Sequence, residues 1–388
     1  MRKKINELDV LAAAYLYGQQ QTQEAIGRNL GLSQTVVSRL LSDAKKQGYT
    51  RKVNTFVRKD LDDAAMARIQ TRVRPVHHLQ EILARLSANG SKLPGPVVHV
   101  YPSQSRNMSL AAWRHRIDDF ANACVKDLLE VLSTATVIGV SWGDTLASVI
   151  AVMKGAATAP GAARRQALTA VPLIGEPLGL NITQHSSSVL AARLEEALNP
   201  EVEPGQGHAL SLAPVPALIP ADMTEPELDA IWKLIGRITA YKEIFGTDGL
   251  IGRIDAVLTS TSTLERPLGF EDDRLLRTAG VPREKLNKLV LGDMCGALIT
   301  RPKLNEAEKA QVESIRKRWT GVTIRQLRGC ASRAAGSSAP GVMVLAIGAN
   351  KAPVVHAAVR GGLIQHLFCD TDLANRLEEM CSGSMPEY

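Results

Sequence analysis

Short apolar runs alternate with segments of helical pattern through most of this chain, and this alternation limits the folds open to it. Strands are expected over 97–100, 136–140, 171–174, 256–259, 289–291, 343–347 and 363–368. Helices are expected over 110–132 (as one or two helices), 145–153, 187–198, 352–360 and 371–380. Apolar strands separated by helices are typical of a mostly parallel sheet covered on both faces. We therefore expect a doubly wound α/β domain.

The basic charge lies in the first fifth of the chain. Residues 1–74 contain 14 Lys+Arg and 7 Asp+Glu, whereas the other 314 residues contain 32 of each, so the formal net charge of +7 comes from the first segment. This asymmetry indicates a small basic module attached to a neutral body. Polyanions attract such modules through phosphate neutralisation. A solvated basic face without a partner is the alternative that charge alone leaves open.

The first fifty residues have the spacing of a helix-turn-helix. We expect one helix over 5–17, a second from the N-cap Thr22 to about residue 30, and a third after the N-cap Ser33. Gly27 is expected where two helices cross, Gly31 in a left-handed turn, and Val37 as a core plug. The alternative is a generic three-helix bundle.

In a helix-turn-helix the third helix lies in the major groove. Its outward polar side chains suit base edges and phosphates, and the lysines after it suit the phosphate backbone. Gln34 either contacts adenine or touches a phosphate. The expected DNA contacts are Thr22, Gln23, Ser33, Gln34, Thr35, Ser38, Arg39, Lys45 and Lys46, with Arg51 and Lys52 as further phosphate contacts.

The sequence divides into three expected parts. Residues 1–58 form the helix-turn-helix domain, with a wing-like strand over 48–53; residues 59–96 form a helical linker with a turn-rich break over 87–96; and residues 97–388 form the α/β domain. The Gly/Ala/Pro-rich stretches 155–163, 199–207 and 331–341 are expected to be surface loops.

Four polar loops are expected directly after strands. In Ser141–Thr145, the Gly143 amide and two hydroxyls are suited to cradle a ligand group, and Asp144 either accepts sugar hydroxyls or caps the helix. The other three loops are 259–262, which includes Thr261, 292–296, where Asp293 is suited to sugar hydroxyls, and 348–351, where Lys351 is suited to an anionic group. A solvated lysine beside a capping Asn350 is the alternative for the last loop. In a parallel sheet these loops meet at one edge.

Several functional classes lack support in the sequence. The five cysteines are scattered without a C-x-x-C pair, so we expect neither a disulfide framework nor a metal site, and we expect a cytoplasmic protein. No apolar stretch reaches the length of a membrane helix, so no membrane partner is expected. No G-x-G-x-x-G or Walker A motif supports a nucleotide cofactor.

Four segments resemble the SorC family of sugar-responsive bacterial transcriptional regulators, a family sometimes grouped with deoxyribonucleoside (DeoR-type) regulators. They are the helix-turn-helix over 22–41, the segment 138–146 (IGVSWGDTL), the segment 291–296 (LGDMCG), and the stretch from 346 (AIGANKA) through 357–363 (AAVRGGL) to 369–370 (CD). The resemblance implies an effector domain similar to ribose-phosphate isomerases and glucosamine-phosphate deaminases. It also implies a dimer or tetramer that binds a palindromic operator and a sugar or sugar phosphate.

The resemblance implies effector contacts from Ser141, Gly143, Thr145, Asp293 and Lys351, to which we add Gly175 and Glu176 as a rim. With Asp144 and Thr261 from the strand-end loops, these residues form the expected effector site. Many relatives have a glycine-rich loop where this chain has Ser141 and Trp142, so the phosphorylation state of the effector stays open.

Three functional hypotheses follow from the sequence. The first is a DNA-binding regulator whose operator affinity depends on a small carbohydrate. The second is a sugar-phosphate isomerase or deaminase on the same fold, with Asp293 or Glu176 as the base, although no acid–base pair stands out. The third is an architectural DNA-binding protein with an inert body.

Overall fold

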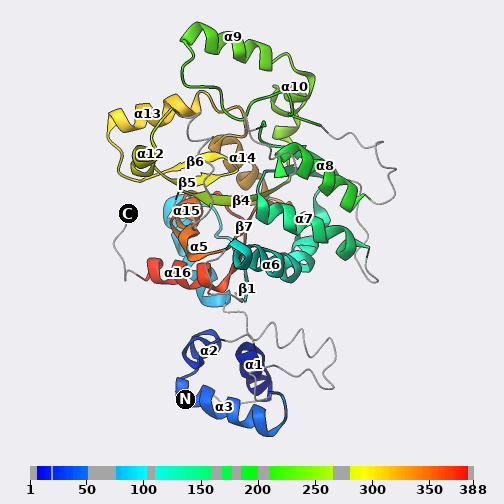
Figure 1. The fold of residues 1–388 in the computed structure, drawn as a ribbon, viewed down its shortest axis with the longest axis vertical. Coiled ribbons are helices and arrows are strands. Elements are labelled where there is room, and N and C mark those ends of the chain that lie inside the picture. The colour runs from blue at the N-terminus through cyan, green and yellow to red at the C-terminus, as the bar shows by residue number, and fades with distance from the viewer. Residues whose placement is uncertain are drawn as a thin grey trace.

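A mixed sheet with helices on both faces forms the larger part of this computed structural model, and three helices at the N-terminus form the smaller part (Figure 1). The structure describes residues 7–18, 21–50, 76–102, 110–158, 168–176, 185–199, 210–264 and 280–382.

The N-terminal helices are α1 (Glu7–Gly18), α2 (Gln23–Leu30) and α3 (Gln34–Lys46), which confirms the three helices expected here. They enclose a hydrophobic cluster of their own that includes Leu16 and Leu40, both at most 1% exposed. Residues 51–53 of the expected strand and the expected domain boundary at residue 58 lie outside the described residues.

The order of the parallel strands is β1-β8-β7-β4-β2-β3. Their bounds are β1 Val97–Tyr101, β2 Val137–Val140, β3 Thr169–Pro172, β4 Ala256–Thr263, β7 Gly341–Ala346 and β8 His366–Asp370. Each strand overlaps a run expected from the sequence, and all five pairings in this order are parallel. The mostly parallel sheet is thereby confirmed.

The two remaining strands, β5 (Val290–Met294) and β6 (Ala297–Thr300), form an antiparallel hairpin that was not predicted. β5 pairs with the far end of β4 and with β6. Residues 259–262 and 292–294 therefore lie within strands, and the prediction that both segments are loops was wrong. Consecutive positive φ angles at Cys295 (56°) and Gly296 (74°) make the tight turn of this hairpin.

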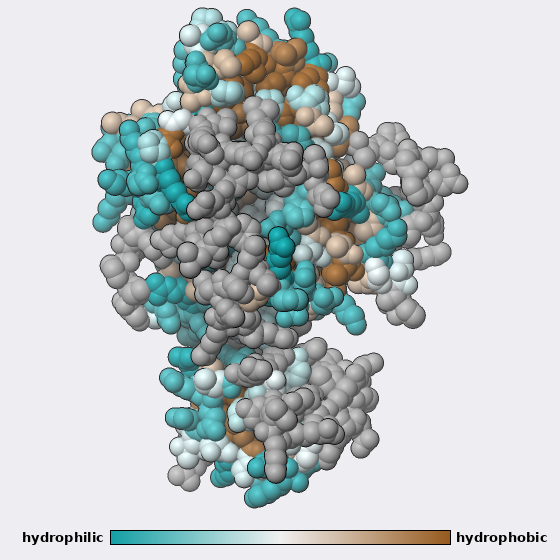
Figure 2. Space-filling model, viewed as in Figure 1, coloured by the Kyte–Doolittle hydropathy of each residue, from teal (hydrophilic) through white to brown (hydrophobic). Residues whose placement is uncertain are grey.

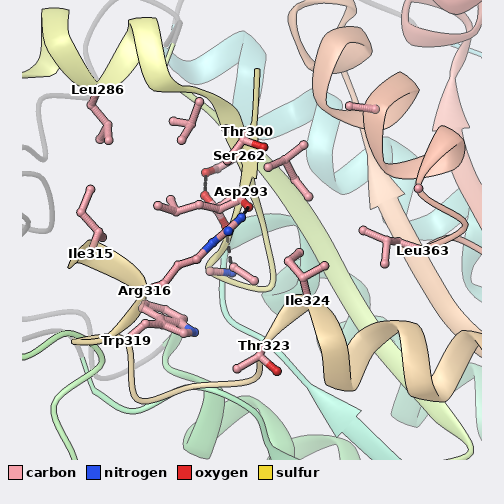
Figure 3. Close-up of a pocket in the computed structure, with 18 of the residues that line it drawn as sticks. Ser262, Leu286, Asp293, Thr300, Ile315, Arg316, Trp319, Thr323, Ile324 and Leu363 are labelled. Carbon is pink, nitrogen blue, oxygen red and sulfur yellow. Dashed lines mark hydrogen bonds between the residues drawn. The ribbon is translucent and has the colours of Figure 1, made fainter. Parts of the chain in front are cut away.

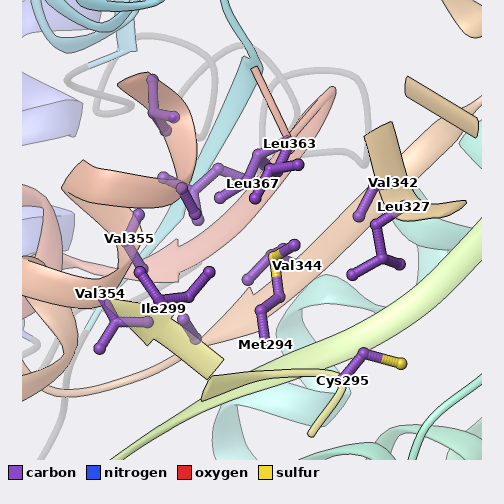
Figure 4. Close-up of a cluster of buried hydrophobic side chains, with 14 of the residues drawn as sticks. Met294, Cys295, Ile299, Leu327, Val342, Val344, Val354, Val355, Leu363 and Leu367 are labelled. Carbon is purple, nitrogen blue, oxygen red and sulfur yellow. The ribbon is translucent and has the colours of Figure 1, made fainter. Parts of the chain in front are cut away.

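Helices cover each face of the sheet with a separate core. One face carries α5 (Val76–Gly90), α14 (Ile324–Ala334), α15 (Ala352–Arg360) and α16 (Thr371–Cys381). The other carries α6 (Leu110–Val131), α7 (Asp144–Ala157) and α8 (Ser187–Leu198). Figure 4 shows the first core, where Val344 of β7 and Leu367 of β8 pack among side chains of the hairpin and α15.

The helix α5 falls in the expected linker but belongs to the core of the larger domain. Its Leu79 and Leu83 are fully buried in the core beneath α15 and α16. The helix continues through Ser87 to Gly90, so the turn-rich break is shorter than the expected 87–96.

Several helices were not expected from the sequence. They are α9 (Glu225–Ile235), α10 (Thr239–Phe245), α12 (Arg283–Leu289), α13 (Glu306–Arg316) and α14, together with the 3-10 turns η1 (Leu132–Thr134), η3 (Leu250–Gly252) and η4 (Ala349–Lys351). Apolar surface gathers over α9 and α10 at the top of the view in Figure 2, where Leu234 is 65% exposed.

Two expected surface loops begin as helix. The helix α14 includes Ala331 to Ala334, and α7 continues to Ala157, so the loops expected from 331 and 155 start later. Alanine-rich sequence has high helix propensity, and this outweighed the neighbouring glycines. Most of 159–163 and 200–207 lies outside the described residues.

Candidate DNA-binding and effector sites

The turn between α2 and α3 has the geometry of a helix-turn-helix. Gly31 ends α2 in the left-handed conformation (φ 64°), and the amide of Leu32 donates to the carbonyl of Gly27 at 2.8 Å. A Cβ at Gly27 would lie 2.7 Å from the Leu32 carbonyl oxygen and 3.7 Å from Val37 Cγ2. The tight crossing at Gly27, the turn at Gly31 and the buried plug at Val37 are therefore confirmed.

The hydroxyls of Thr22 and Ser33 cap the two helices. Thr22 Oγ1 accepts a hydrogen bond from the Ala25 amide at 3.2 Å, and Ser33 Oγ accepts one from the Val36 amide at 3.4 Å. Each cap fixes the direction in which its helix begins. Both hydroxyls keep a proton to donate, so capping leaves them able to contact a phosphate.

The outer face of α3 is polar and exposed. Its buried residues, Val37, Leu40, Leu41 and Ala44, all face α1 and α2, whereas Val36 is half-buried. The exposed side chains expected to contact DNA on and beside this helix are Ser33, Gln34, Thr35, Ser38, Arg39, Lys45 and Lys46, while Thr22 is exposed and Gln23 half-buried at the start of α2. Lys46 lies 3.8 Å from Asp43 in an exposed ion pair, which is weak.

The larger domain has a topological switch point between β2 and β4. The chain leaves β2 into α7, on one face of the sheet, and reaches α14, on the other face, after β4 and the hairpin. Chain segments that leave neighbouring strands toward opposite faces open a crevice at the carboxyl edge of the sheet. Ser141, at the end of β2, lies beside Thr259 of β4 in this crevice.

Ser141 belongs to a buried hydroxyl cluster. It is 1% exposed, its Oγ accepts from Thr259 Oγ1 at 2.9 Å, and it donates to the Trp142 carbonyl at 3.4 Å. The thiol of Cys295 lies against both hydroxyls, and burial raises its pKa. This cluster holds β2, β4 and the hairpin together, so the hydroxyl of Ser141 is already engaged within the protein.

The loop after β2 positions Asp144 at the first residue of α7. Gly143, which precedes it, has a φ of 119° and donates its amide to the His185 carbonyl at 3.3 Å. One Asp144 carboxylate oxygen lies 2.7 Å from Nδ1 of His185. The amide expected to point at a ligand is thus already paired, and Asp144 faces His185 rather than capping the helix itself. Thr145, also in this first turn, is 6% exposed.

Asp293 lies on the hairpin, where it is fixed by two hydrogen bonds. Its carboxylate accepts from the hydroxyl of Ser262 on the paired strand β4 and from the Gly296 amide at 2.9 Å. Successive side chains alternate between the faces of a strand, so Thr261 faces away from Ser262 and Asp293. Thr261 is 2% exposed, and its hydroxyl has no hydrogen-bond partner among the described residues.

Lys351 is a buried cation at this edge. Its side chain follows β7 on the turn η4 and is 9% exposed, and it forms no hydrogen bond or ion pair with another residue that the structure describes. Burial lowers the pKa of Lys351 to about 8, although the carboxylates of Asp370, Asp293 and Asp144 act in the opposite direction. Lys351 is therefore brought to the same edge as Asp144 and Asp293.

A buried ion pair that the sequence analysis missed lies beside Lys351. Arg116 of α6 donates from Nε to Asp370 Oδ2 at 2.9 Å and from Nη2 to Asp372 at 2.8 Å. Asp370 also accepts from the amides of Leu373, at 3.0 Å, and Gly348, at 3.1 Å. Burial raises the pKa of Asp370, and each of these donors opposes that shift.

The two residues expected to form the rim of the effector site, Gly175 and Glu176, lie just after β3. Gly175 has no room for a Cβ, which would lie 2.4 Å from the Val215 carbonyl oxygen, and Glu176 bridges to Pro216 through its backbone. The side chain of Glu176 is half-buried. The sequence correctly predicted that Asp144 and Lys351 follow strands, whereas Asp293, predicted in a loop, lies within β5. It missed Asp370, Arg116 and His185.

A separate cavity of about 760 Å³ opens under the hairpin, and Figure 3 shows its lining. Of the expected effector contacts only Asp293 lines it, and Arg316 reaches from α13 toward that residue. The remaining labelled side chains are mostly apolar, among them Leu286, Ile315 and Trp319. Sugars need converging polar groups, so we place the candidate effector site at the strand ends rather than in this cavity.

No protein-family model matches this sequence, and a search of curated proteins found no match either. Solved structures do match the fold. Their likeness to this chain is one of fold, and it confirms the α/β fold class expected from the sequence.

One such structure is the full-length sorbitol operon regulator SorC from Klebsiella pneumoniae, with a TM-score of 0.52, 20% identity, and coverage of 95% of this chain and 98% of that one. A DeoR family transcriptional regulator from Listeria monocytogenes has a TM-score of 0.52 and 18% identity, covering 78% of this chain and 97% of its own. A transcriptional regulator from Streptococcus pneumoniae TIGR4 has a TM-score of 0.54 and 12% identity, covering 79% and 98%. Within the described part of this chain, no helix has the length and hydrophobicity to cross a membrane.

Proposed function

We propose that this protein is a DNA-binding transcriptional regulator whose operator affinity changes when a small carbohydrate binds the carboxyl edge of its sheet. The observation that carries the proposal is the combination of a helix-turn-helix, whose helix α3 has an exposed polar face, with an α/β domain in one chain. Over 95% of its length this chain matches the fold of a full-length sorbitol operon regulator. The effector is a sugar, a polyol or a sugar phosphate.

The proposed mechanism is a shift between two arrangements of an oligomer. A dimer or tetramer presents two copies of α3 to successive major grooves of a palindromic operator. An effector that binds one arrangement better changes the spacing of the two helices and with it the affinity for DNA.

A regulatory rather than catalytic role is supported by the chemistry of the edge. An isomerase or deaminase needs a base placed at the sugar carbonyl. Asp293 is held by Ser262 and Gly296, and the Glu176 backbone is fixed against Pro216. Isomerisation of ribose 5-phosphate above background, abolished by Asp293→Ala, would contradict this part of the proposal.

The test begins with the DNA. Full-length protein is used to select its binding sequence from random duplexes, and affinity is then measured by fluorescence anisotropy at several salt concentrations. We expect Arg39→Ala to weaken binding by about tenfold, the effect of losing a good base or phosphate contact. Arg328→Ala, which removes an exposed arginine of α14 in the larger domain, is the matched control and leaves binding unchanged. Equal affinity of both variants would remove α3 from the interface.

The response to an effector is tested with the same duplex. We expect one member of a panel of sugars, polyols and their phosphates to change operator affinity, and Lys351→Met to blunt that change while operator binding remains. A protein that binds DNA but responds to no compound, in anisotropy or in thermal stability, would favour an architectural role instead.

A further inference from the structure

Two of the helix N-termini at the carboxyl edge, those of α7 and α16, already carry carboxylates of the chain itself. Helix N-termini attract anions through their free amides and the helix dipole. At α16 this position holds Asp370, which accepts from the Leu373 amide, and at α7 it holds Asp144 on the first residue of the helix. The amide of Gly143, just before α7, donates to the His185 carbonyl. At these two N-termini the position where a phosphate would bind is thus taken by an aspartate, and Lys351 precedes the first turn of α15.

The cations of this edge do not compensate for these aspartates. Arg116 is bound by two carboxylates, those of Asp370 and Asp372. Lys351 is influenced by the carboxylates of Asp293 and Asp144 as well as Asp370. A phosphate ester carries a charge of about −1.5 to −2 at neutral pH, and one lysine among several carboxylates does not balance it.

The same groups are well matched to neutral hydroxyls. The ammonium of Lys351 offers three donors and has no hydrogen bond or ion pair with another described residue, and the residue as a whole is 9% exposed. The carboxylates of Asp144 and Asp293 offer acceptors; Asp144 is 49% exposed at its side chain. A hydroxyl both donates and accepts, so neighbouring hydroxyls of one molecule satisfy a lysine and an aspartate together.

We infer that the effector site selects an uncharged polyhydroxylated ligand, a free sugar or polyol, and discriminates against its phosphorylated form. The carboxylate of Asp144 at the start of α7 is the main element of this discrimination. The inference rests on the proposed function, because it concerns the ligand of that same site.

The test compares matched pairs of compounds on the full-length protein. The pairs are sorbitol and sorbitol 6-phosphate, mannitol and mannitol 1-phosphate, ribose and ribose 5-phosphate, and glucose and glucose 6-phosphate, with inorganic phosphate as a probe of a bare anion site. Thermal stability and operator affinity are the two measurements. We expect a free compound to act, its phosphate ester to bind about tenfold more weakly or worse, and inorganic phosphate to have no effect.

A charge-removing variant separates this inference from simple shape selection. Asp144→Asn keeps the size of the side chain, and because Asp144 is half-exposed the fold is expected to survive, which circular dichroism checks. We expect this variant to reduce the discrimination against the phosphate ester by about tenfold. Asp229→Asn, on an exposed position of α9, is the control for a general change in net charge and leaves the discrimination unchanged.

The outcomes are distinct. Phosphate esters that bind as tightly as their free partners, or more tightly, would overturn the inference and leave the proposed function standing. Unchanged discrimination in Asp144→Asn would also overturn it. If no member of any pair acts on stability or operator affinity, the effector site itself is refuted, and this inference with it.

Discussion

Lys351→Met is expected to stabilise the unliganded protein at neutral pH. In the folded protein the pKa of Lys351 is about 8, against 10.5 for a free lysine side chain, so the folded state disfavours the charged form. A difference of this size corresponds to about 3 kcal/mol, from about 1.4 kcal/mol for each pKa unit. Methionine fills a similar volume without a charge, so the variant avoids this cost.

The stability difference between Lys351→Met and the parent protein is expected to decrease as the pH rises. Below pH 8 Lys351 is protonated in the folded and unfolded states, and the full cost is present. Between pH 8 and 10.5 the unfolded chain binds the extra proton, so the stability of the parent protein rises with pH relative to the variant. Above 10.5 the lysine is neutral in both states, and the advantage of Lys351→Met disappears. Because other groups titrate alike in both proteins, the difference between them isolates Lys351.

The assay is urea unfolding followed by tryptophan fluorescence. All four tryptophans lie in the larger domain, at positions 113, 142, 232 and 319, so the signal reports this domain and not the three N-terminal helices. Unfolding is measured at pH 7, 9 and 10.5 without carbohydrate. A variant less stable than the parent at pH 7, or a stability difference that stays constant over this range, would refute the assignment of Lys351 as a destabilising buried cation.

Two further predictions concern packing and charge elsewhere. Gly27→Val places side-chain atoms against the Leu32 carbonyl and is expected to destabilise the helix-turn-helix by about 2 kcal/mol, which far-UV thermal melts and a loss of operator binding would show. The control is Gly155→Ala, in open space on α7, which is expected to gain up to about 1 kcal/mol of stability. Equal effects of the two variants would contradict the tight crossing at Gly27. Asp370→Asn weakens the buried pair with Arg116 and is expected to cost about 3 kcal/mol in urea unfolding, and a change near zero would show that the pair is dispensable.

Local sequence signals predicted many elements well. The helix α8 begins after the N-cap Ser186, and α15 ends before Gly361, so both bounds match the expected ones. The turn at Gly31 was predictable because few other residues adopt its conformation without strain. These features depend on a few neighbouring residues and are independent of the rest of the fold.

Features fixed by distant contacts were not predictable. The hydroxyl-rich end of β4 resembles a turn in sequence, and only its pairing with β5 makes it a strand. The helix α13 has five charged residues among its eleven and buries only Val312 and Ile315, so its apolar stripe is too short for periodicity to detect. Asp370 carries a visible capping signal before α16, yet its ion pair with Arg116 joins residues 254 positions apart. Lys351 was predictable as a strand-end residue, but its burial was not.

The pairing of β1 with β8 has a consequence for the synthesis of the protein. Val97 pairs with His366 and Tyr101 with Asp370, so the first strand of the sheet has its hydrogen-bonding neighbour in the last one. During translation the edge of β1 stays open until nearly the whole domain has left the ribosome, because contacts so distant in sequence form late. The three N-terminal helices have a core of their own and no such requirement. A chain interrupted before residue 366 would therefore carry a folded set of N-terminal helices on an incomplete sheet, and its fate would depend on how quickly chaperones or proteases engage that exposed edge.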